Sequence, residues 1–185
     1  MNWESVTIKK YNEIVSLKCD TETEEQLRSI GILNGLTLDQ VKSLKLTKLS
    51  EYVQEVEELS KTDIPNKPQK KWKGYKIGYN IKYITAGQMM DYDTIRGEGD
   101  DIANLHKYMS ILTNPKDLKE FEDRAELFYN EMPIGVAYGC HVFFWKLIKN
   151  YEKRLATYLK EKESKTSSPN IGVGRRFFTF LQGNT

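Results

Sequence analysis

The longest helix that the sequence predicts covers residues 133–163, PIGVAYGCHVFFWKLIKNYEKRLATYLKEKE. Its large apolar residues recur every three or four positions, which is the spacing of one face of an α-helix. Gly135, Ala137 and Gly139 lie in its first turns, where small side chains allow another backbone to approach closely. Glycines and a histidine interrupt the apolar part and lysines follow it, so we expect a buried helix and no membrane span. This helix should organise the C-terminal part of the fold.

Residues 72–84, which precede this helix, alternate large apolar and other side chains with a period of two, as is typical of a β-strand. Gly74 and Gly78 predict a hairpin or a bulge within this stretch. Residues 63–71 contain two prolines and no apolar period, which predicts an extended linker. The hairpin is the one β segment that the sequence predicts.

Residues 7–61, on the other side of the linker, have helical periodicity and predict four short helices. Thr21 and Thr37 each precede a Glu or Gln by three positions, which is the capping-box pattern of a helix start, and Gly35 should end the second helix. After the hairpin, Thr85 precedes Gln88 in the same pattern, and further short helices follow up to the long one.

The predicted fold class is mainly α, with two helical units joined by a Pro/Lys linker and one small β-hairpin. Residues 1–64 form an N-terminal four-helix unit, residues 65–163 the hairpin and a helical unit with the long C-terminal helix, and residues 164–185 a basic arm that contains Gly and Phe. Residues 1–64 hold 8 basic and 12 acidic side chains and residues 65–185 hold 20 and 14, so the net charge changes from −4 to +6 at the linker.

The composition excludes several classes of protein. Of the 185 residues 39% are hydrophobic and 11% aromatic, which is enough to bury a core and excludes a disordered chain. The net charge of +2 is too balanced for a protein that coats nucleic acid or anionic membranes. Cys19 and Cys140 lie far apart in sequence, which fits a reducing compartment. The N-terminal residues lack the features of a signal peptide, so no export is expected.

Candidate catalytic and metal-binding groups are few. An acidic cluster spans residues 91–101, but it matches no metal-binding spacing and is interpreted as a solvated loop and helix cap. Cys140 and His141 are adjacent on a predicted helix and point about 100° apart, so they do not converge on one ion. Cys140 also lies on the apolar face of that helix, where a cysteine is usually a small core residue. Residues 172–174, GVG, lack the further glycine or lysine of a nucleotide site. We therefore predict no catalytic residue, no metal site and no cofactor.

The C-terminal arm is the strongest candidate for partner binding. It carries two arginines and three phenylalanines without an acidic residue, and exposed phenylalanines favour docking into a groove on this chain or on a neighbour. Trp3 and Trp72 are secondary candidates. The arm residues concerned are Arg175, Arg176, Phe177, Phe178 and Phe180.

The hairpin region also suggests a nucleic-acid site. Lysines alternate there with Trp72, Tyr75 and Tyr79, a combination that can hold phosphates while bases stack on the rings. The alternation also fits a hairpin whose aromatic residues face the core and whose lysines face water, and it favours that interpretation. The lysines are Lys67, Lys70, Lys71, Lys73 and Lys76.

Several local patterns together resemble a family of small bacteriophage proteins that are encoded among virion-assembly genes and are tail-assembly chaperone-like. The matching stretches are residues 3–11 (WESVTIKKY), 30–37 (IGILNGLT), 84–91 (ITAGQMMD) and 132–136 (MPIGV) followed by Phe143 and Phe144. The resemblance implies a helical protein that binds virion components, and it carries no catalytic residues over to this chain. The basic arm departs from the family pattern.

The hypothesis that follows is a non-enzymatic bacteriophage protein, either a minor structural or cargo component of the virion or a tail-assembly chaperone. Its expected partners are other phage structural proteins of the tail, the portal region or the capsid interior, and its expected location is the virion, the host cell cytoplasm or both. Self-association stays open, and nucleic-acid binding through the lysines of the hairpin region is the alternative.

Overall fold

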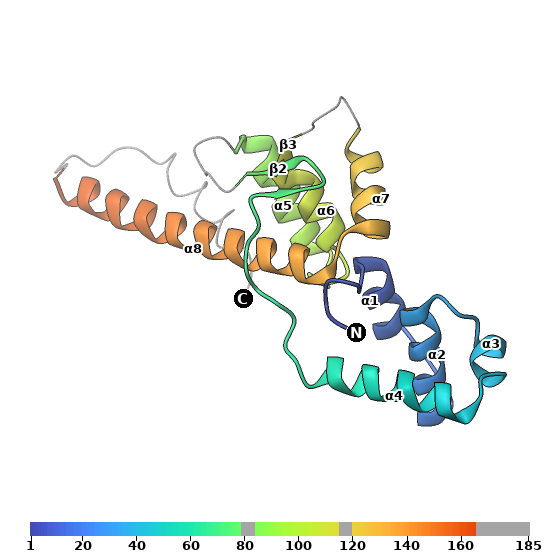
Figure 1. Ribbon diagram of the computed structural model, residues 1–185. Coiled ribbons are helices and arrows are strands. Elements are labelled where there is room, and N and C mark those ends of the chain that lie inside the picture. The colour runs from blue at the N-terminus through green and yellow to red at the C-terminus, as the bar shows by residue number, and fades with distance from the viewer. Residues whose placement is uncertain (79–83, 115–119, 166–185) are drawn as a thin grey trace. The chain divides into compact units, whose positions relative to one another are not determined.

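The computed structural model describes residues 1–78, 84–114 and 120–165 of the chain. This part of the chain is mainly α with a small antiparallel sheet, as the sequence predicts (Figure 1). The helices are α1 (Ile8–Val15), α2 (Glu22–Asn34), α3 (Leu38–Lys42), α4 (Leu46–Ser60), α5 (Ala86–Gly97), α6 (Leu105–Leu112), α7 (Phe121–Glu131) and α8 (Ile134–Lys165). The strands are β1 (Lys71–Trp72), β2 (Tyr75–Ile77) and β3 (Thr113–Asn114).

Threonine hydroxyls cap four of these helices. The hydroxyls of Thr7, Thr21, Thr37 and Thr85 accept a hydrogen bond from the backbone N–H three positions on, at 3.2–3.3 Å. Gly35 ends α2 with a φ of 69°, a left-handed conformation that suits glycine. The caps predicted at Thr21, Thr37 and Thr85 and the stop at Gly35 are confirmed.

The start of the chain is fastened to the start of α8. The N–H of Ile8 donates to the carbonyl of Met132 at 3.0 Å, and the N–H of Ile134 donates to the carbonyl of Val6 at 2.8 Å. All four of these side chains are at most 1% exposed. The two segments therefore share one buried cluster despite their distance in sequence.

The linker packs on the small residues of α8. A Cβ atom added to Gly139 would lie 2.6 Å from the carbonyl oxygen of Lys67, and one added to Gly135 would lie 3.1 Å from the ring of Pro65. The predicted close approach of another backbone is thus confirmed at Gly139, where that backbone is the linker, and Gly135 is approached by a proline ring of the same linker.

The sheet has the strand order β1-β2-β3. The hairpin turn between β1 and β2 is Lys73-Gly74, and both residues have positive φ, 43° and 85°, as tight two-residue hairpins require. Strand β3 follows α6 directly and pairs Thr113 with Ile77, which the sequence did not predict. Of the predicted alternation over residues 72–84, residues 79–83 lie outside the described part of the chain.

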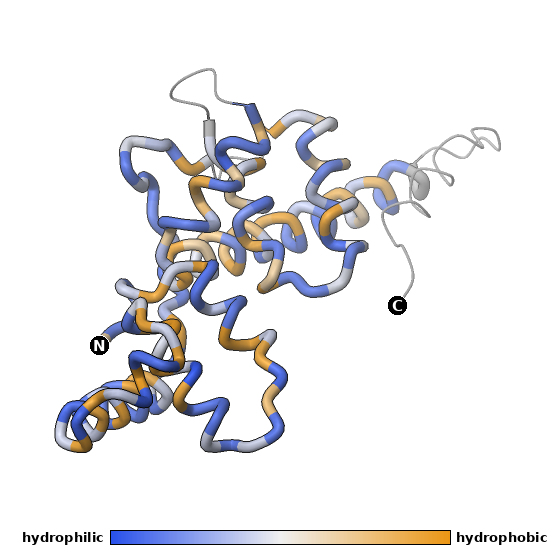
Figure 2. Tube along the Cα trace, turned by 90° about the vertical axis from the view of Figure 1, so that its right-hand side faces the viewer, coloured by the Kyte–Doolittle hydropathy of each residue, from blue (hydrophilic) through white to orange (hydrophobic). Residues whose placement is uncertain are grey.

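Residues Met1–Ile148 form one compact unit and Lys149–Thr185 a second. The core of the first unit combines side chains from both sides of the linker, such as Ile8 and Leu33 with Tyr75, Met109 and Phe144. Figure 1 shows α5, α6 and α7 side by side, and hydrophobic and hydrophilic residues mix along the helices in Figure 2. The compact units do not separate at residue 64, and an independent unit of residues 1–64 stays a prediction.

Helix α8 has 32 residues, close to the predicted range. Its residues up to Ile148 include most of the buried side chains of the helix, whereas no side chain between 149 and 162 is buried. Within the described part of the chain, no helix combines the length and apolarity that a membrane crossing requires.

Candidate functional site

All five lysines of the predicted basic patch are exposed. The aromatic residues between them turn inward, because Tyr75 is only 6% exposed and its ring centroid lies 5.3 Å from that of Phe128. Trp72 is half-buried against the same phenylalanine at 5.7 Å. Lys73 forms an ion pair with Glu131. The interpretation with core-facing aromatic residues is confirmed for Tyr75, and Tyr79 lies outside the described residues.

The other predicted partner-binding residues fall into two groups. The indole N–H of Trp3 lies 3.0 Å from both the carbonyl and the hydroxyl oxygen of Thr62, and its ring contacts Tyr11. Trp3 thus joins the chain start to the end of α4, and its role in partner binding stays a prediction. Arg175, Arg176, Phe177, Phe178 and Phe180 all lie outside the described residues.

The acidic cluster of residues 91–101 makes mainly structural contacts, as expected for a loop. The expected helix cap is wrong, because α6 begins after Asn104 without a side-chain cap and Asp100 accepts hydrogen bonds from the turn before it. In the part of the chain that the structure describes, no group of three or more His, Cys, Asp or Glu residues is arranged to hold a metal ion. The contacts are Asp93 with Arg96 at 3.8 Å, Glu98 with Lys107 at 2.7 Å, Asp100 with the N–H groups of Ile102 and Ala103, and Asp101 with the hydroxyl of Tyr108 at 2.6 Å.

A buried polar cluster joins α5, α6 and α8. The hydroxyl of Tyr92 lies 3.3 Å from Nδ1 of His141, and the His141 ring centroid lies 4.6 Å from that of Tyr108. Cys140 turns the other way, with Sγ 3.8 Å from the carbonyl oxygen of Gln69. Both residues are buried, Cys140 completely, so the predicted divergence of Cys140 and His141 is confirmed.

Burial controls the protonation of this cluster. It raises the pKa of the Tyr92 and Tyr108 hydroxyls well above their ordinary value, with a further increase at Tyr108 from the hydrogen bond to Asp101. Burial also lowers the pKa of His141, and the charge of Asp101 offsets part of that effect. At neutral pH the cluster is therefore a set of neutral rings that fixes the packing of the three helices.

A surface groove lies between α1, α6 and α7. It consists of two adjoining hollows of about 530 and 300 Å³, which share Asn12, Ala103 and Tyr129. The side-chain amide of Asn12 donates to the carbonyl of Ala103 at 3.1 Å, which ties α1 to the turn before α6. We call this feature the α1–α6–α7 groove.

The lining of the groove is apolar and aromatic. Ala103 and Ala125 line it beside the rings of Phe121 and Tyr129, and Val15, 61% exposed, lies in the smaller hollow. The ring centroid of His106 is 5.0 Å from that of Tyr129, and burial together with the charge of Lys107 lowers the pKa of His106. The histidine therefore presents a neutral ring at neutral pH.

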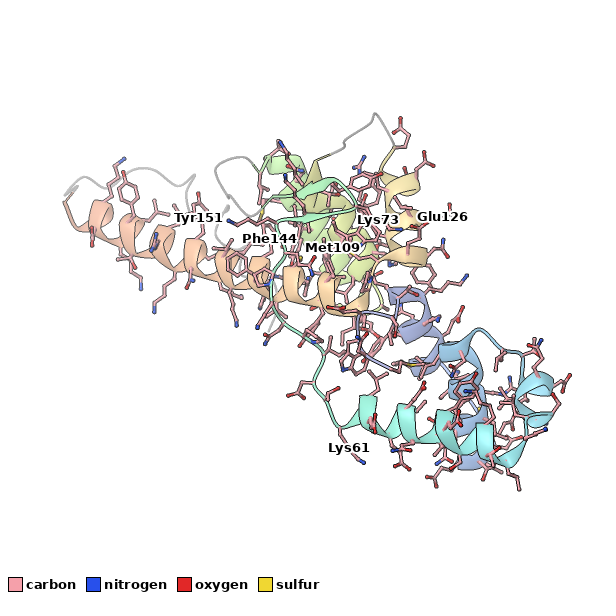
Figure 3. All side chains as sticks on the ribbon, viewed as in Figure 1. Lys61, Lys73, Met109, Glu126, Phe144 and Tyr151 are labelled. Atoms are coloured by element: carbon pink, nitrogen blue, oxygen red, sulfur yellow. The ribbon has the colours of Figure 1, made fainter. Side chains whose placement is uncertain are left out.

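Carboxylates dominate the charge of the groove. Glu13, Asp100, Glu122 and Glu126 line it, and none of them forms an ion pair within residues 1–78, 84–114 and 120–165. Among the described lining residues Lys107 is the one lysine, and Glu98 pairs with it at 2.7 Å. Figure 3 shows Glu126 on the outer side of α7, whereas Met109 and Phe144 lie among the core helices. The groove thus combines an apolar lining with acidic edges.

A smaller groove between α2 and α4 has a related character. Its volume is about 400 Å³, and Ile30, Val53 and Val56 line it together with three glutamates. One of these, Glu57, lies 3.9 Å from Lys61. None of the described residues that line this α2–α4 groove is aromatic.

The sequence did not predict either groove. Glu122, Glu126 and Tyr129 lie at positions i, i+4 and i+7 of α7, so the spacing places them on one helix face. The spacing alone does not say that this face stays uncovered, because that depends on where α1 and α6 lie.

No protein-family model matches this chain, and neither do any curated proteins or solved structures.

Proposed function

We propose that this chain is a non-enzymatic protein that acts in bacteriophage virion assembly by binding other virion proteins. The observation that supports binding is the α1–α6–α7 groove, an open apolar surface between three helices with aromatic side chains and four carboxylates at its edges. Aromatic residues in partly desolvated grooves are the usual anchors of protein–protein interfaces. The groove is thus suited to a polypeptide segment with apolar and basic side chains.

The assembly part of the proposal rests on the resemblance of residues 3–11, 30–37, 84–91 and 132–136 to virion-assembly proteins. Two of these stretches, 3–11 and 132–136, contain the residues that form one buried cluster in the fold, namely Val6, Ile8, Met132 and Ile134. The stretches that carry the resemblance therefore include residues of the hydrophobic core. This core holds in place the helices that form the groove.

Photo-crosslinking in infected cells tests the proposal. A photoreactive amino acid at Val15, in the groove, is compared with one at Tyr151, which is 49% exposed on α8. We expect the probe at position 15 to crosslink a virion structural protein, identified by mass spectrometry, and the probe at position 151 to give no such product.

A pair of charge-reversal variants controls this experiment. Glu122→Lys with Glu126→Lys changes two exposed groove carboxylates, whereas Glu120→Lys with Asp123→Lys makes the same change of charge near the start of α7 outside the groove lining. The first variant should lose the crosslink and the second should keep it. Equal crosslinking at both probe positions, or only to host proteins, would contradict the proposal.

A second candidate function is nucleic-acid binding, which the exposure of Lys67, Lys70, Lys71, Lys73 and Lys76 favours. With Tyr75 buried, the lysines would contact phosphates without that ring for stacking. Such binding is measured as the affinity for duplex and single-stranded DNA between 50 and 200 mM salt. A steep loss of affinity would support it, and a shallow slope would remove it.

A further inference from the structure

We propose that the α1–α6–α7 groove binds residues 166–185, the greater part of the basic C-terminal arm, of a second copy of this chain. This inference rests on the proposed function and names one of its partners. The groove offers an apolar, aromatic lining with carboxylates that form no ion pair among the described residues, and the arm is a segment of the same chain with the opposite charge and matching apolar side chains.

The charges of the two partners are complementary. The groove lining has four carboxylates without an ion-pair partner in the described part of the chain, and the one lysine among its described residues, Lys107, is already paired with Glu98. Residues 166–185 contain Arg175 and Arg176 and no Asp or Glu. Guanidinium groups form charge-assisted hydrogen bonds with carboxylates, so the arginines fit the acidic edge formed by Glu122 and Glu126.

The apolar surfaces match as well. The arm carries Phe177, Phe178 and Phe180, and large apolar side chains gain free energy when a groove removes them from water. Phe121 and Tyr129 offer aromatic rings for edge-to-face contacts, and Ala103 and Ala125 leave room between them. Arginine also stacks favourably on aromatic rings such as that of Tyr129.

The α2–α4 groove is the main competing site on this chain. It is smaller, no aromatic residue is among its described lining, and one of its glutamates lies near Lys61. The aromatic lining and the four carboxylates that form no ion pair with any described residue favour the α1–α6–α7 groove. A contact in which one copy places its arm in the groove of the next is heterologous and produces rings or filaments, which suits a protein that acts in assembly.

The test uses the full-length chain with a photoreactive phenylalanine analogue in place of Phe178. Equal amounts of unlabelled and ¹⁵N-labelled protein are mixed and irradiated, and the crosslinked peptides are identified by mass spectrometry. We expect crosslinks from position 178 to α1, α6 and α7 that join a light to a heavy copy. A probe at Tyr158, which is 54% exposed on α8, is the control and should not reach these helices.

Charge reversal completes the test. Glu122→Lys with Glu126→Lys should lower the crosslink yield roughly five- to tenfold, the effect of two exposed ion pairs. Glu120→Lys with Asp123→Lys should leave the yield unchanged. Arg175→Glu with Arg176→Glu should lower it as well, and combining this change with the groove reversal should restore most of it.

Three results would overturn the inference: crosslinks confined to a single copy, crosslinks to the α2–α4 groove, or a yield that does not respond to the groove charges. These results can be distinguished from a failure of the proposed function, which the probe at Val15 tests in infected cells. Crosslinks between copies without any virion partner would support the arm contact and contradict the assembly role.

Discussion

Gly139 is a residue at which α8 and the linker lie very close together. A Cβ atom there would lie within 2.9 Å of three backbone atoms of Lys67, which have little freedom to move. We expect Gly139→Ala to lower the free energy of unfolding by about 1–3 kcal/mol, as overpacking does, measured by chemical denaturation. Gly97→Ala is the matched control, because nothing lies within 4 Å of that position, and it should be neutral or stabilise by up to about 1 kcal/mol. Equal effects of the two substitutions would contradict the close approach.

His141 makes the stability of the fold depend on pH. Because burial lowers its pKa in the folded state below the ordinary value of 6.5, the unfolded chain binds a proton first as the pH falls. The stabilisation is therefore complete above about pH 6.5 and is lost as the pH decreases towards the folded pKa, by at most about 1.4 kcal/mol per pH unit for each such histidine. His141→Gln should reduce the slope of unfolding free energy between pH 7.5 and 5.5. An unchanged slope would contradict a neutral, buried His141.

The sequence predicted the direction of Cys140 and His141 but not their contacts. Helical periodicity is a local property, and it places the two residues on different faces of α8. Tyr92 and Tyr108, which contact His141, lie on other helices, and only the packing of α5 and α6 brings them together. The buried cluster could therefore not be inferred from spacing.

Thr85 and Gln88 form a complete capping box at the start of α5. The Thr85 hydroxyl accepts from the Gln88 N–H at 3.2 Å, and the Gln88 side-chain oxygen accepts from the Thr85 N–H at 3.0 Å. We expect Thr85→Ala to destabilise the protein by about 1 kcal/mol and to lower the Tm by about 2–4 °C. Thr94 is exposed in the middle of the same helix, so Thr94→Ala should leave the Tm within about 1 °C of that of the unchanged protein. A similar Tm for both variants would show that the cap contributes little.

At the scale of secondary-structure elements, the sequence predicted the helices better than the strands. Most helices begin with a hydroxyl cap or an apolar period that is visible in the sequence, which is why the starts at Thr21, Thr37 and Thr85 are correct. Strand β3 has only two residues and no period of its own, and it exists because β2 offers an unpaired edge beside the end of α6. Pairing between distant segments leaves no local signal.

At the scale of the whole molecule, we expect the two parts of α8 to differ in their stability against local unfolding. Up to Ile148 the helix contributes buried side chains to the core, whereas between residues 149 and 162 no side chain is buried. Amide hydrogen exchange followed by mass spectrometry should therefore show slow exchange over 136–148 and much faster exchange over 152–162. Equal protection of both parts would mean that the second part of the helix is packed as firmly as the first.

The candidate site, the α1–α6–α7 groove, also exists only at the scale of the whole molecule, because the packing of distant segments forms it. The α1–α6–α7 groove combines residues from three helices between Asn12 and Tyr129, so its shape and charge depend on the tertiary fold. The arginines and phenylalanines of the C-terminal arm, which we propose as the occupant of this groove, are visible in the sequence. The sequence also placed the hairpin lysines in water correctly, because alternation in a strand is local.

Quantitative mass spectrometry of purified virions beside infected-cell lysate tests the role in virion assembly most directly. The account predicts peptides of this chain in at least one of these samples, together with its virion partner. A defined copy number in virions would identify a structural or cargo component, and abundance in the lysate alone would identify an assembly chaperone. Absence of the chain from both virions and lysate would contradict the account.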